Sequence, residues 1–304
     1  MRILVTGLNG LIGSQAAYEI LGDSLLAHHE YFSFIRTRSN SSTSLPSRIL
    51  PSHVIYGDCS KHSDFRNAII NSSPDIILHI AQLRYVPTLL SALDSVDLEP
   101  FLILVGSTGI YSKFLTCSSP YKKSEYLLAA SKYSYCILRP TLIYGHKSDR
   151  NIHRLYEALQ RSRPILLPAG GVSLFQPVYY KDVAHAITHA LRRYLCGSLP
   201  ARSSYNIVGP DVISLRDICK SIKSLQVSSS VLLSVPIYPL YILVCFLYLV
   251  SFQRFFLRPE QILRLREDKV FSSDWSIFDP MHTPTPLKNG LNLLHDQYRF
   301  SDSL

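Results

Sequence analysis

A glycine-rich turn near the start of the sequence constrains the fold more than any other feature. An apolar run, 3–5, leads into TGLNGLIG at 6–13, and a helical stretch, 14–21, follows. In a strand–turn–helix unit with this spacing, the glycines permit a tight turn, a close approach to a pyrophosphate and close packing of the helix on the strand. The helix N-terminus favours the negative charge. We therefore expect a buried parallel strand followed by a dinucleotide site, with contacts from Gly7, Asn9, Gly10, Leu11, Ile12 and Gly13.

The residues after the second apolar run bear on which dinucleotide is bound. Chains that bind NAD in this way place Asp or Glu at the end of that strand, where it holds the ribose hydroxyls. Here the run at 31–35 is followed by Arg36, Thr37 and Arg38. Two guanidinium groups suit a 2′-phosphate, which favours NADP over NAD. A solvated basic loop without a ligand is the alternative, and it stays open at this point.

Further apolar runs predict four more strands, at 53–58, 75–82, 101–105 and 135–138, with helical patterns between them. Strands that alternate with helices are typical of βαβ units and a parallel sheet. The expected fold class is therefore α/β, a doubly wound parallel sheet of the Rossmann type with a smaller α/β part. Because ligands bind outside the carboxyl ends of such strands, we expect further cofactor contacts at Asp58, Cys59, His79, Ala81, Gln82 and Pro140.

Composition excludes several classes of protein. With 47% hydrophobic and 17% charged residues, the chain is neither disordered nor collagen-like. Its six cysteines are scattered without a CxxC pair, which argues against a zinc ribbon or a disulfide framework. The formal net charge is +9, but no nucleic-acid motif is present, so we expect no nucleic-acid partner. The first apolar run is too short for a secretory signal, and a cytoplasmic location is expected.

Two histidines form a candidate pair of metal ligands. His185 and His189 lie four residues apart in a helical pattern, a spacing that metal ligands use. No third ligand is evident in the sequence. We therefore expect core or surface histidines and no metal site.

Seven short motifs follow one another along the chain: TGLNGLIG at 6–13, GD at 57–58, LHIA at 78–81, STGIY at 107–111, LRPTLIYG at 138–145, QPVYYKDVA at 176–184 and YNIVG at 205–209. In this order they resemble the extended short-chain dehydrogenases/reductases, in their nucleotide-sugar epimerase/dehydratase branch. The resemblance covers residues 1 to about 225. It implies an NAD(P)-binding domain over 1–148, completed by about 176–208, and a substrate-binding cap formed by 149–175 and 209–304.

The resemblance also implies a reaction and its ligands. It implies an epimerase, dehydratase or reductase that uses NADP or NAD on a sugar linked to a nucleotide or to polyprenyl diphosphate. The candidate substrate contacts are Arg150, Asn151 and Gln176. A homodimer is compatible with this class, and the sequence does not fix the oligomeric state.

The catalytic residues of this family match the sequence in part. The resemblance implies a Ser or Thr after the fifth strand, and a Tyr and a Lys four residues apart on one helix face. Ser107 fits the first role, with Thr108 as the alternate. Counting back from Glu125, however, Cys117 stands at the tyrosine position and Tyr121 at the lysine position.

Three interpretations of this site stay open. In the first, Tyr121 or Tyr111 exchanges a proton. Its lysine would be Lys122 or Lys123, which requires irregular backbone at the neighbouring proline because adjacent helical residues face apart. In the second, the Ser or Thr acts with the cofactor by another mechanism. In the third, the protein binds nucleotide or sugar without turnover, as a catalytically silent assembly or sensor protein.

An uncharged stretch, 224–253, contains a hydrophobic helix predicted at about 240–257. A helix that is apolar all round is buried in protein or in lipid. Pro236 and Pro239 shorten the run below the about 20 residues that a spanning helix needs. We therefore expect a helix that lies in a membrane interface and brings the protein to the membrane surface. A core helix and a spanning helix are the alternatives.

Overall fold

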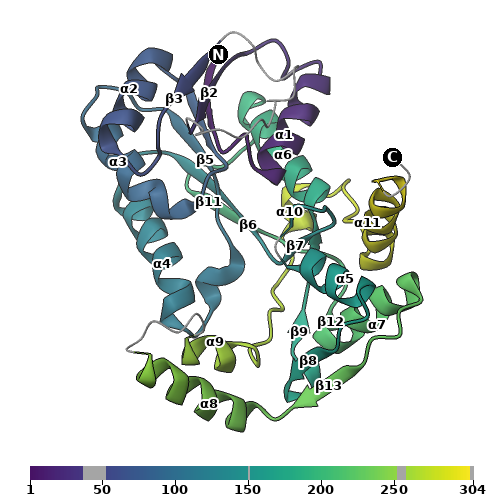
Figure 1. Ribbon diagram of the computed structural model, residues 1–304. Helices are drawn as coiled ribbons and strands as arrows, with labels where there is room; N and C mark the ends of the chain where they lie inside the picture. Colours follow the sequence, from purple (N-terminus) through teal and green to yellow (C-terminus); the bar gives the residue numbers. More distant parts are fainter. Residues whose placement is uncertain (37–52, 150, 252–257, 302–304) are drawn as a thin grey trace.

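A parallel seven-stranded sheet forms the centre of the larger part of the molecule (Figure 1). The computed structural model describes residues 1–36, 53–149, 151–251 and 258–301. The strand order is β11-β6-β5-β4-β1-β2-β3, and every neighbouring pair is parallel. The strands are β1 (Arg2–Thr6), β2 (Glu30–Ile35), β3 (Val54–Tyr56), β4 (Ile76–His79), β5 (Phe101–Val105), β6 (Tyr135–Pro140) and β11 (Ser203–Ile207). The order reverses between β1 and β4, and in such sheets the ligand crevice lies at this reversal.

Helices cover both faces of this sheet (Figure 1). α1 (Leu11–Gly22) and α6 (Tyr180–Leu195) share one buried cluster with the strands, and α2 (His62–Ser72), α3 (Val86–Asp94) and α4 (Leu115–Ala130) share the other. Because both faces are covered, a central strand such as β4 is buried at every position. The architecture is the doubly wound α/β fold that the sequence predicts.

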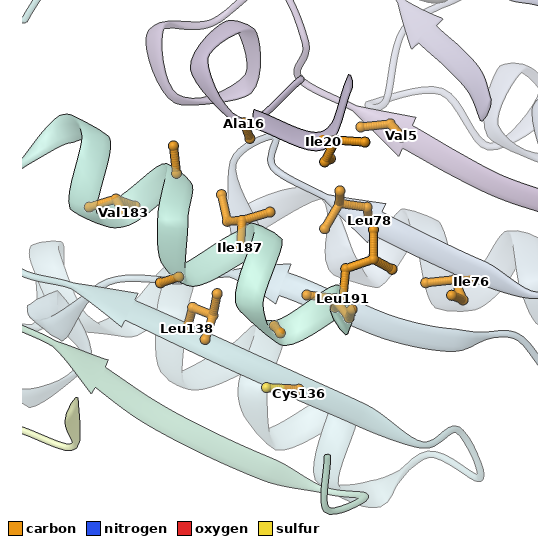
Figure 2. Packing of buried hydrophobic residues seen from close by; sticks show 14 of the residues in the cluster. Val5, Ala16, Ile20, Ile76, Leu78, Cys136, Leu138, Val183, Ile187 and Leu191 are labelled. Atoms are coloured by element: carbon orange, nitrogen blue, oxygen red, sulfur yellow. The ribbon is translucent and has the colours of Figure 1, made fainter. Parts of the chain in front are cut away.

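Helix α6, from the second half of the chain, completes the core of the first half (Figure 2). Its apolar stripe, Val183, Ile187 and Leu191, recurs every four residues and points toward the sheet and α1. The side chains around this stripe are buried and come from β1, β4, β6 and α1: Val5, Ile76, Leu78, Cys136, Leu138, Ala16 and Ile20. The packing therefore ties sequence-distant segments into one unit.

A smaller set of elements lies beyond the carboxyl ends of the strands and has its own buried cluster (Figure 1). It is built from three two-stranded pairs, β7 with β10, β8 with β13 and β9 with β12, and from the helices packed on them. The strands are β7 (Ile143–Tyr144), β8 (Ile165–Pro168), β9 (Leu174–Phe175), β10 (Val178–Tyr179), β12 (Ile213–Ser214) and β13 (Leu232–Val235). Its helices are α5 (Ile152–Gln160), α7 (Leu215–Gln226) and α11 (Leu287–Ser301), with a 3-10 turn at η3 (Ala169–Gly171). The short helix α10 (Trp275–Phe278) packs instead in the sheet core, and the 3-10 turns η1 (Leu83–Tyr85) and η2 (Thr108–Tyr111) follow β4 and β5.

The predicted hydrophobic helix is α8 (Ile237–Val250), which packs on α9 (Pro259–Arg264). It begins three residues earlier than expected because Pro239 falls in the first turn, where the missing amide hydrogen breaks no helical bond. It is described to Val250. The expected start at about 240 is therefore wrong, and the expected end at 257 lies among residues 252–257, outside the described residues. Within the described part of the chain, no helix combines the length and the apolar character needed to cross a bilayer.

Candidate active site

The glycine turn has the geometry of a backbone cradle. Gly7 adopts φ +81°, and a Cβ there would stand 2.6 Å from the Ala81 nitrogen. At Gly13 a Cβ would stand 2.2 Å from the Gly7 carbonyl oxygen. Only a glycine at position 13 therefore allows the helix to pack this close to the turn. Helix α1 starts at Leu11, directly after Gly10, and its first amides face the crevice side without a side-chain cap. Among the remaining predicted contacts, Asn9 is exposed and Ile12 is half-buried.

The predicted contact His79 lies inside the core. Its side chain is fully buried, and Nδ1 lies 2.9 Å from the Thr6 hydroxyl oxygen. The Thr6 oxygen also accepts from the Ala81 amide at 3.4 Å, while His79 Nε2 lies 3.3 Å from the Gln82 carbonyl oxygen. Burial lowers the pKa of His79 to about 4. The histidine therefore braces the strand end and presents no side-chain surface to a ligand.

The basic residue after β2 faces the loop after β3. Arg36 is exposed, and its positive charge contributes to holding the pKa of Asp58 below its ordinary value, after the hydrogen bonds from Ser60. Asp58 accepts from the Ser60 amide at 2.8 Å. Burial raises the pKa of the Cys59 thiol to about 11, so it stays a neutral contact surface. The second predicted guanidinium, Arg38, lies outside the described residues.

Three predicted or aligned side chains gather around Gly109. A Cβ at Gly109 would meet Tyr121 Cε2 at 3.1 Å, Ser107 Oγ at 3.3 Å and Cys117 Sγ at 3.4 Å. Ser107 Oγ accepts the Gly109 amide at 3.0 Å. The structure thus brings Cys117 and Tyr121, four residues apart on α4, to one side of the loop that carries Ser107. Thr108 is buried and donates to the Pro140 carbonyl oxygen at 3.3 Å, which leaves it a structural role in this geometry.

The two predicted lysines lie elsewhere. Lys122 and Lys123 are exposed on α4, and the helix runs without interruption through Pro120. The irregular backbone that would turn a lysine toward Tyr121 is absent from this described helix. The first interpretation requires irregular backbone at Pro120, and the structure does not provide it: a proline removes one helical hydrogen bond, and the flanking turns of α4 retain their helical form.

A polar chain crosses the carboxyl ends of β5 and β6. Glu125 binds Arg139 through two contacts, of which Nε to Oε1 measures 3.0 Å, and both side chains are largely buried. Arg139 Nη1 also donates to the Tyr111 hydroxyl at 2.9 Å, and that hydroxyl donates to Asn206 Oδ1 at 3.1 Å. A cation therefore stands beside the phenol of Tyr111 in a fixed geometry.

A cavity of about 520 Å³ opens beside this chain. Its walls combine the loop after β5, the loop after β6 and the segment that follows α9. The lining residues are Ser107, Thr108, Gly109, Tyr111, Ser112, Thr141, Leu142, Ile143, Asn151, Phe175, Gln261, Arg264, Leu265, Glu267, Asp268, Lys269 and Phe271. Of the predicted catalytic residues, Ser107 and Thr108 belong to this wall, whereas Tyr121, Lys122 and Lys123 are outside it.

The segment after α9 closes the cavity. The sequence patterns do not predict that its residues belong to the site. Glu267 accepts from the Ser112 hydroxyl at 2.8 Å and from the Lys113 amide at 2.7 Å. Lys269 donates to the Glu267 carbonyl oxygen at 3.0 Å and lies 4.5 Å from the centre of the Phe175 ring. Burial, with the positive charge of Arg264, lowers the pKa of the Lys269 ammonium. No local pattern marks Glu267, because its partners Ser112 and Lys113 lie about 155 positions away.

The predicted substrate contacts are placed unequally. Asn151 lines the cavity. Gln176 is buried, and its side chain accepts from the Phe271 amide at 3.1 Å, so it fixes the closing segment rather than facing the cavity. Arg150 lies outside the described residues.

The sequence matches a known protein family. A model of the NAD dependent epimerase/dehydratase family matches residues 3–93 and 118–207, more than half of the chain. The chain belongs to this family. The stretch between the two matches, 94–117, carries Ser107 and Cys117, so the match is interrupted at the loop of the candidate site.

Individual proteins are also similar to this chain. The uncharacterized protein YbjS of Escherichia coli (strain K12) is 33% identical over 88 residues, which cover 29% of this chain and 26% of that protein. The match therefore spans about a quarter of that relative's length. A UDP-glucuronic acid 4-epimerase from Bacillus cereus, solved with UDP-glucuronic acid and NAD, is 17% identical with a TM-score of 0.71 over 99% of this chain and 100% of that one.

A triphenylmethane reductase from Citrobacter sp., solved with NADP(H), is 14% identical with a TM-score of 0.69 over 97% of this chain and 100% of that one. At these identities the structural likeness establishes the shared fold.

Proposed function

We propose that the protein is an NADP- or NAD-dependent epimerase, dehydratase or reductase that acts on a sugar linked to a nucleotide or to polyprenyl diphosphate. One observation carries the proposal: a glycine turn that excludes any Cβ lies at the end of β1, and a cavity beside Ser107 opens at the ends of β5 and β6. Neighbours of the same fold support the ligand classes, since they were solved with UDP-glucuronic acid and NAD or with NADP(H).

The turn residues fit the nicotinamide dinucleotide that the family uses. Gly7, Gly10 and Gly13 would let the backbone and the first amides of α1 hold the pyrophosphate. Arg36 would face the ribose, where a guanidinium suits the 2′-phosphate of NADP. The bound nicotinamide supplies hydride acceptance or donation.

Residues of the cavity wall would bind the substrate and handle its proton. Ser107 Oγ accepts from the Gly109 amide, so its own proton is free to be donated to a substrate oxygen. Tyr111 is the tyrosine on the wall, held between Arg139 and Asn206. Tyr121 lies behind Gly109 and reaches a substrate only if the loop shifts. We therefore propose Ser107 for positioning and place Tyr111 ahead of Tyr121 for proton exchange.

A specific observation favours a second candidate function. Counted back from Glu125, the position of the family's catalytic tyrosine falls on Cys117, and the two predicted lysines are exposed on α4. A chain that keeps the cradle and loses the Tyr–Lys pair fits a catalytically silent binding protein that assembles with or reports to another component.

The outer face of α8 supports a membrane-surface location for either function. Six large apolar side chains on one half of the helix are exposed, led by Leu249 at 74% and Ile242 at 65%; the others are Tyr238, Leu243, Phe246 and Val250. The opposite half packs on α9 through Ile237 and Val244. A continuous apolar half-cylinder without a charge is the pattern of a helix that lies in a bilayer interface.

The position of α8 connects this face to the cavity. α9, on which α8 packs, contributes Gln261 and Arg264 to the cavity wall. A basic side chain, Arg266, donates to the Tyr238 hydroxyl at 3.1 Å at the edge of the apolar face. The net charge of +9 complements an anionic bilayer. We therefore propose that the exposed face of α8 binds the surface of a lipid bilayer. Binding there would bring the cavity close to a sugar linked to a lipid.

Cofactor titration followed by turnover assays tests the proposed function. NADPH and NADH fluorescence should change on binding, and Arg36→Ala should weaken NADPH binding more than NADH binding. Conversion of a UDP-sugar or a polyprenyl-diphosphate sugar by the wild type, lost in Tyr111→Phe and retained in Lys122→Ala, would support the enzyme. Binding without conversion of either class supports the silent alternative, and an intact protein that binds neither cofactor refutes both.

A further inference from the structure

Three side chains far from the cavity converge at the junction of α6 and the residue after α10. His185 Nε2 lies 2.8 Å from Asp279 Oδ2, and His189 Nδ1 lies 3.2 Å from the same oxygen. One ligand atom from each residue lies within 4.8 Å of the other two. The sequence supplied the histidine pair but no third ligand, because Asp279 is 94 residues from His185.

The hydrogen bonds around His189 leave its Nδ1 without a proton in the neutral ring. Nε2 lies 3.0 Å from the Phe278 carbonyl oxygen, which can only accept, so Nε2 carries the hydrogen. The Nδ1 lone pair then points at a carboxylate oxygen. Two acceptors at this distance need a cation between them, which is either a proton on Nδ1 or a metal ion. A metal-bound histidine also usually donates its other ring N–H to a backbone carbonyl or a carboxylate, as His189 Nε2 does here to Phe278.

The other two groups are equally restrained. The His185 ring stacks on His282 at 4.3 Å between centroids, with 15° between the planes. The Asp279 side chain is 8% exposed, and its backbone amide donates to the Trp275 carbonyl oxygen at 2.8 Å. No lysine or arginine among the described residues forms an ion pair with this carboxylate.

The spacing of these atoms suits a small divalent ion. Ligands about 2.0–2.2 Å from a tetrahedral zinc ion lie about 3.3 Å from one another. The two measured separations to Asp279 Oδ2, 2.8 Å and 3.2 Å, are close to that value. Both imidazoles also line a surface cavity of about 630 Å³ together with Glu19, so water can reach the point where the three atoms meet.

We propose that His185 Nε2, His189 Nδ1 and Asp279 Oδ2 bind a divalent transition-metal ion of the zinc class, with water completing the coordination. His2Asp with an open position is an established donor set for such ions. The ion would clamp the residues after α10 to α6 and so fix the C-terminal part of the chain on the sheet domain. The site is independent of the cavity and of the function proposed for it.

Metal titration of the chelator-treated full chain tests the proposal. Zn²⁺ should bind by calorimetry at about one ion per chain and raise the thermal midpoint. Co²⁺ should give the intense visible absorption of a tetrahedral N/O site. His189→Ala should weaken binding by more than about a hundredfold and remove the gain in thermal midpoint. His28→Ala, which removes an exposed histidine elsewhere, should leave both unchanged.

Asp279→Asn provides a second decisive variant, since it keeps the shape of the side chain and removes its charge. If it does not fold, His189→Ala at the half-buried position decides alone, with circular dichroism to show that it is folded. The proposal is overturned if the wild type binds no Zn²⁺, if His189→Ala binds as tightly as His28→Ala, or if the Co²⁺ spectrum is the weak one of an octahedral aqua ion.

Discussion

The Thr6 hydroxyl lies 2.9 Å from Nδ1 of His79, inside the core directly beneath the glycine turn. The contacts around it run in one direction: the Ala81 amide donates to Thr6, Thr6 donates to His79, and His79 Nε2 faces the Gln82 carbonyl oxygen. This arrangement suits the neutral imidazole, whose Nδ1 accepts and whose Nε2 donates. The glycine turn and the neighbouring strand end are thus joined by an imidazole whose burial favours its neutral form.

His79 should therefore make folding stability depend on pH. Its pKa is lowered from 6.5 to about 4, so the unfolded chain binds the proton more tightly than the folded one. The contribution is fully present above about pH 6.5 and is lost as pH falls toward about 4, with a size on the order of 3 kcal/mol. Urea unfolding of the wild type and His79→Gln across this window should show a flatter pH profile in the variant. Parallel profiles would contradict the assignment.

Two glycines of α1 distinguish the proposed dinucleotide turn from the rest of the helix. At Gly13 a Cβ would lie 2.2 Å from the Gly7 carbonyl oxygen, whereas at Gly22 nothing lies within 4 Å. Gly13→Ala should abolish NADPH binding and destabilise the fold, because backbone atoms cannot yield to the methyl group. Gly22→Ala, at the end of α1, should bind normally and gain up to about 1 kcal/mol from helix propensity. Equal NADPH affinity in the two variants would show that the turn does not hold the dinucleotide.

How much the sequence reveals depends on the range of the interaction. The strand at 101–105 was predicted residue for residue, and the glycine spacing led directly to the strand–turn–helix unit that is present. Both follow from neighbouring residues, where apolar runs and steric limits act locally. The start of α8 lies before the predicted one, because Pro239 does not interrupt the helix and lies in a first turn that tolerates a proline.

Local sequence patterns do not predict contacts between segments that lie far apart in the sequence. Glu267 binds Ser112 across 155 residues, and Asp279 meets His185 across 94. Such pairs depend on where the C-terminal segment crosses the strand ends, which no periodicity encodes. The exposure of Lys122 and Lys123 had a similar cause, since it depends on which face of α4 packs on the sheet. The site therefore departs from expectation where tertiary packing decides it.

The ion pair of Glu125 and Arg139 should be a strong contributor to stability. Their side chains are 10% and 16% exposed, and Arg139 also holds Tyr111. Glu125→Gln leaves a largely buried guanidinium without its countercharge and should cost about 3 kcal/mol in urea unfolding. Glu99→Gln breaks the pair with Lys132, where the side chains are 65% and 52% exposed, and should leave the free energy of unfolding nearly unchanged because solvent screens an exposed pair. Similar losses in both variants would argue against this difference.

The apolar half of α8 should govern binding to vesicles. Phe246 is 61% exposed at the middle of the face, and burying such a side chain in lipid contributes about 1.5–3 kcal/mol. Phe246→Asp should therefore lower the partition coefficient onto phosphatidylglycerol-rich vesicles by at least about tenfold, as measured by co-sedimentation. Ile277→Asp removes an apolar side chain that is 71% exposed on α10 and should bind as the wild type does.

Two outcomes would reject the lipid surface as the occupant of this face. One is that the wild-type protein does not co-sediment with anionic vesicles at low salt, where its electrostatic attraction to the vesicle surface is strongest. The other is a wild-type dimer, seen by light scattering, that Phe246→Asp converts to a monomer while Ile277→Asp does not. In that case a second copy of the chain covers α8, and access of a lipid-linked sugar to the cavity at Gln261 and Arg264 loses its physical basis.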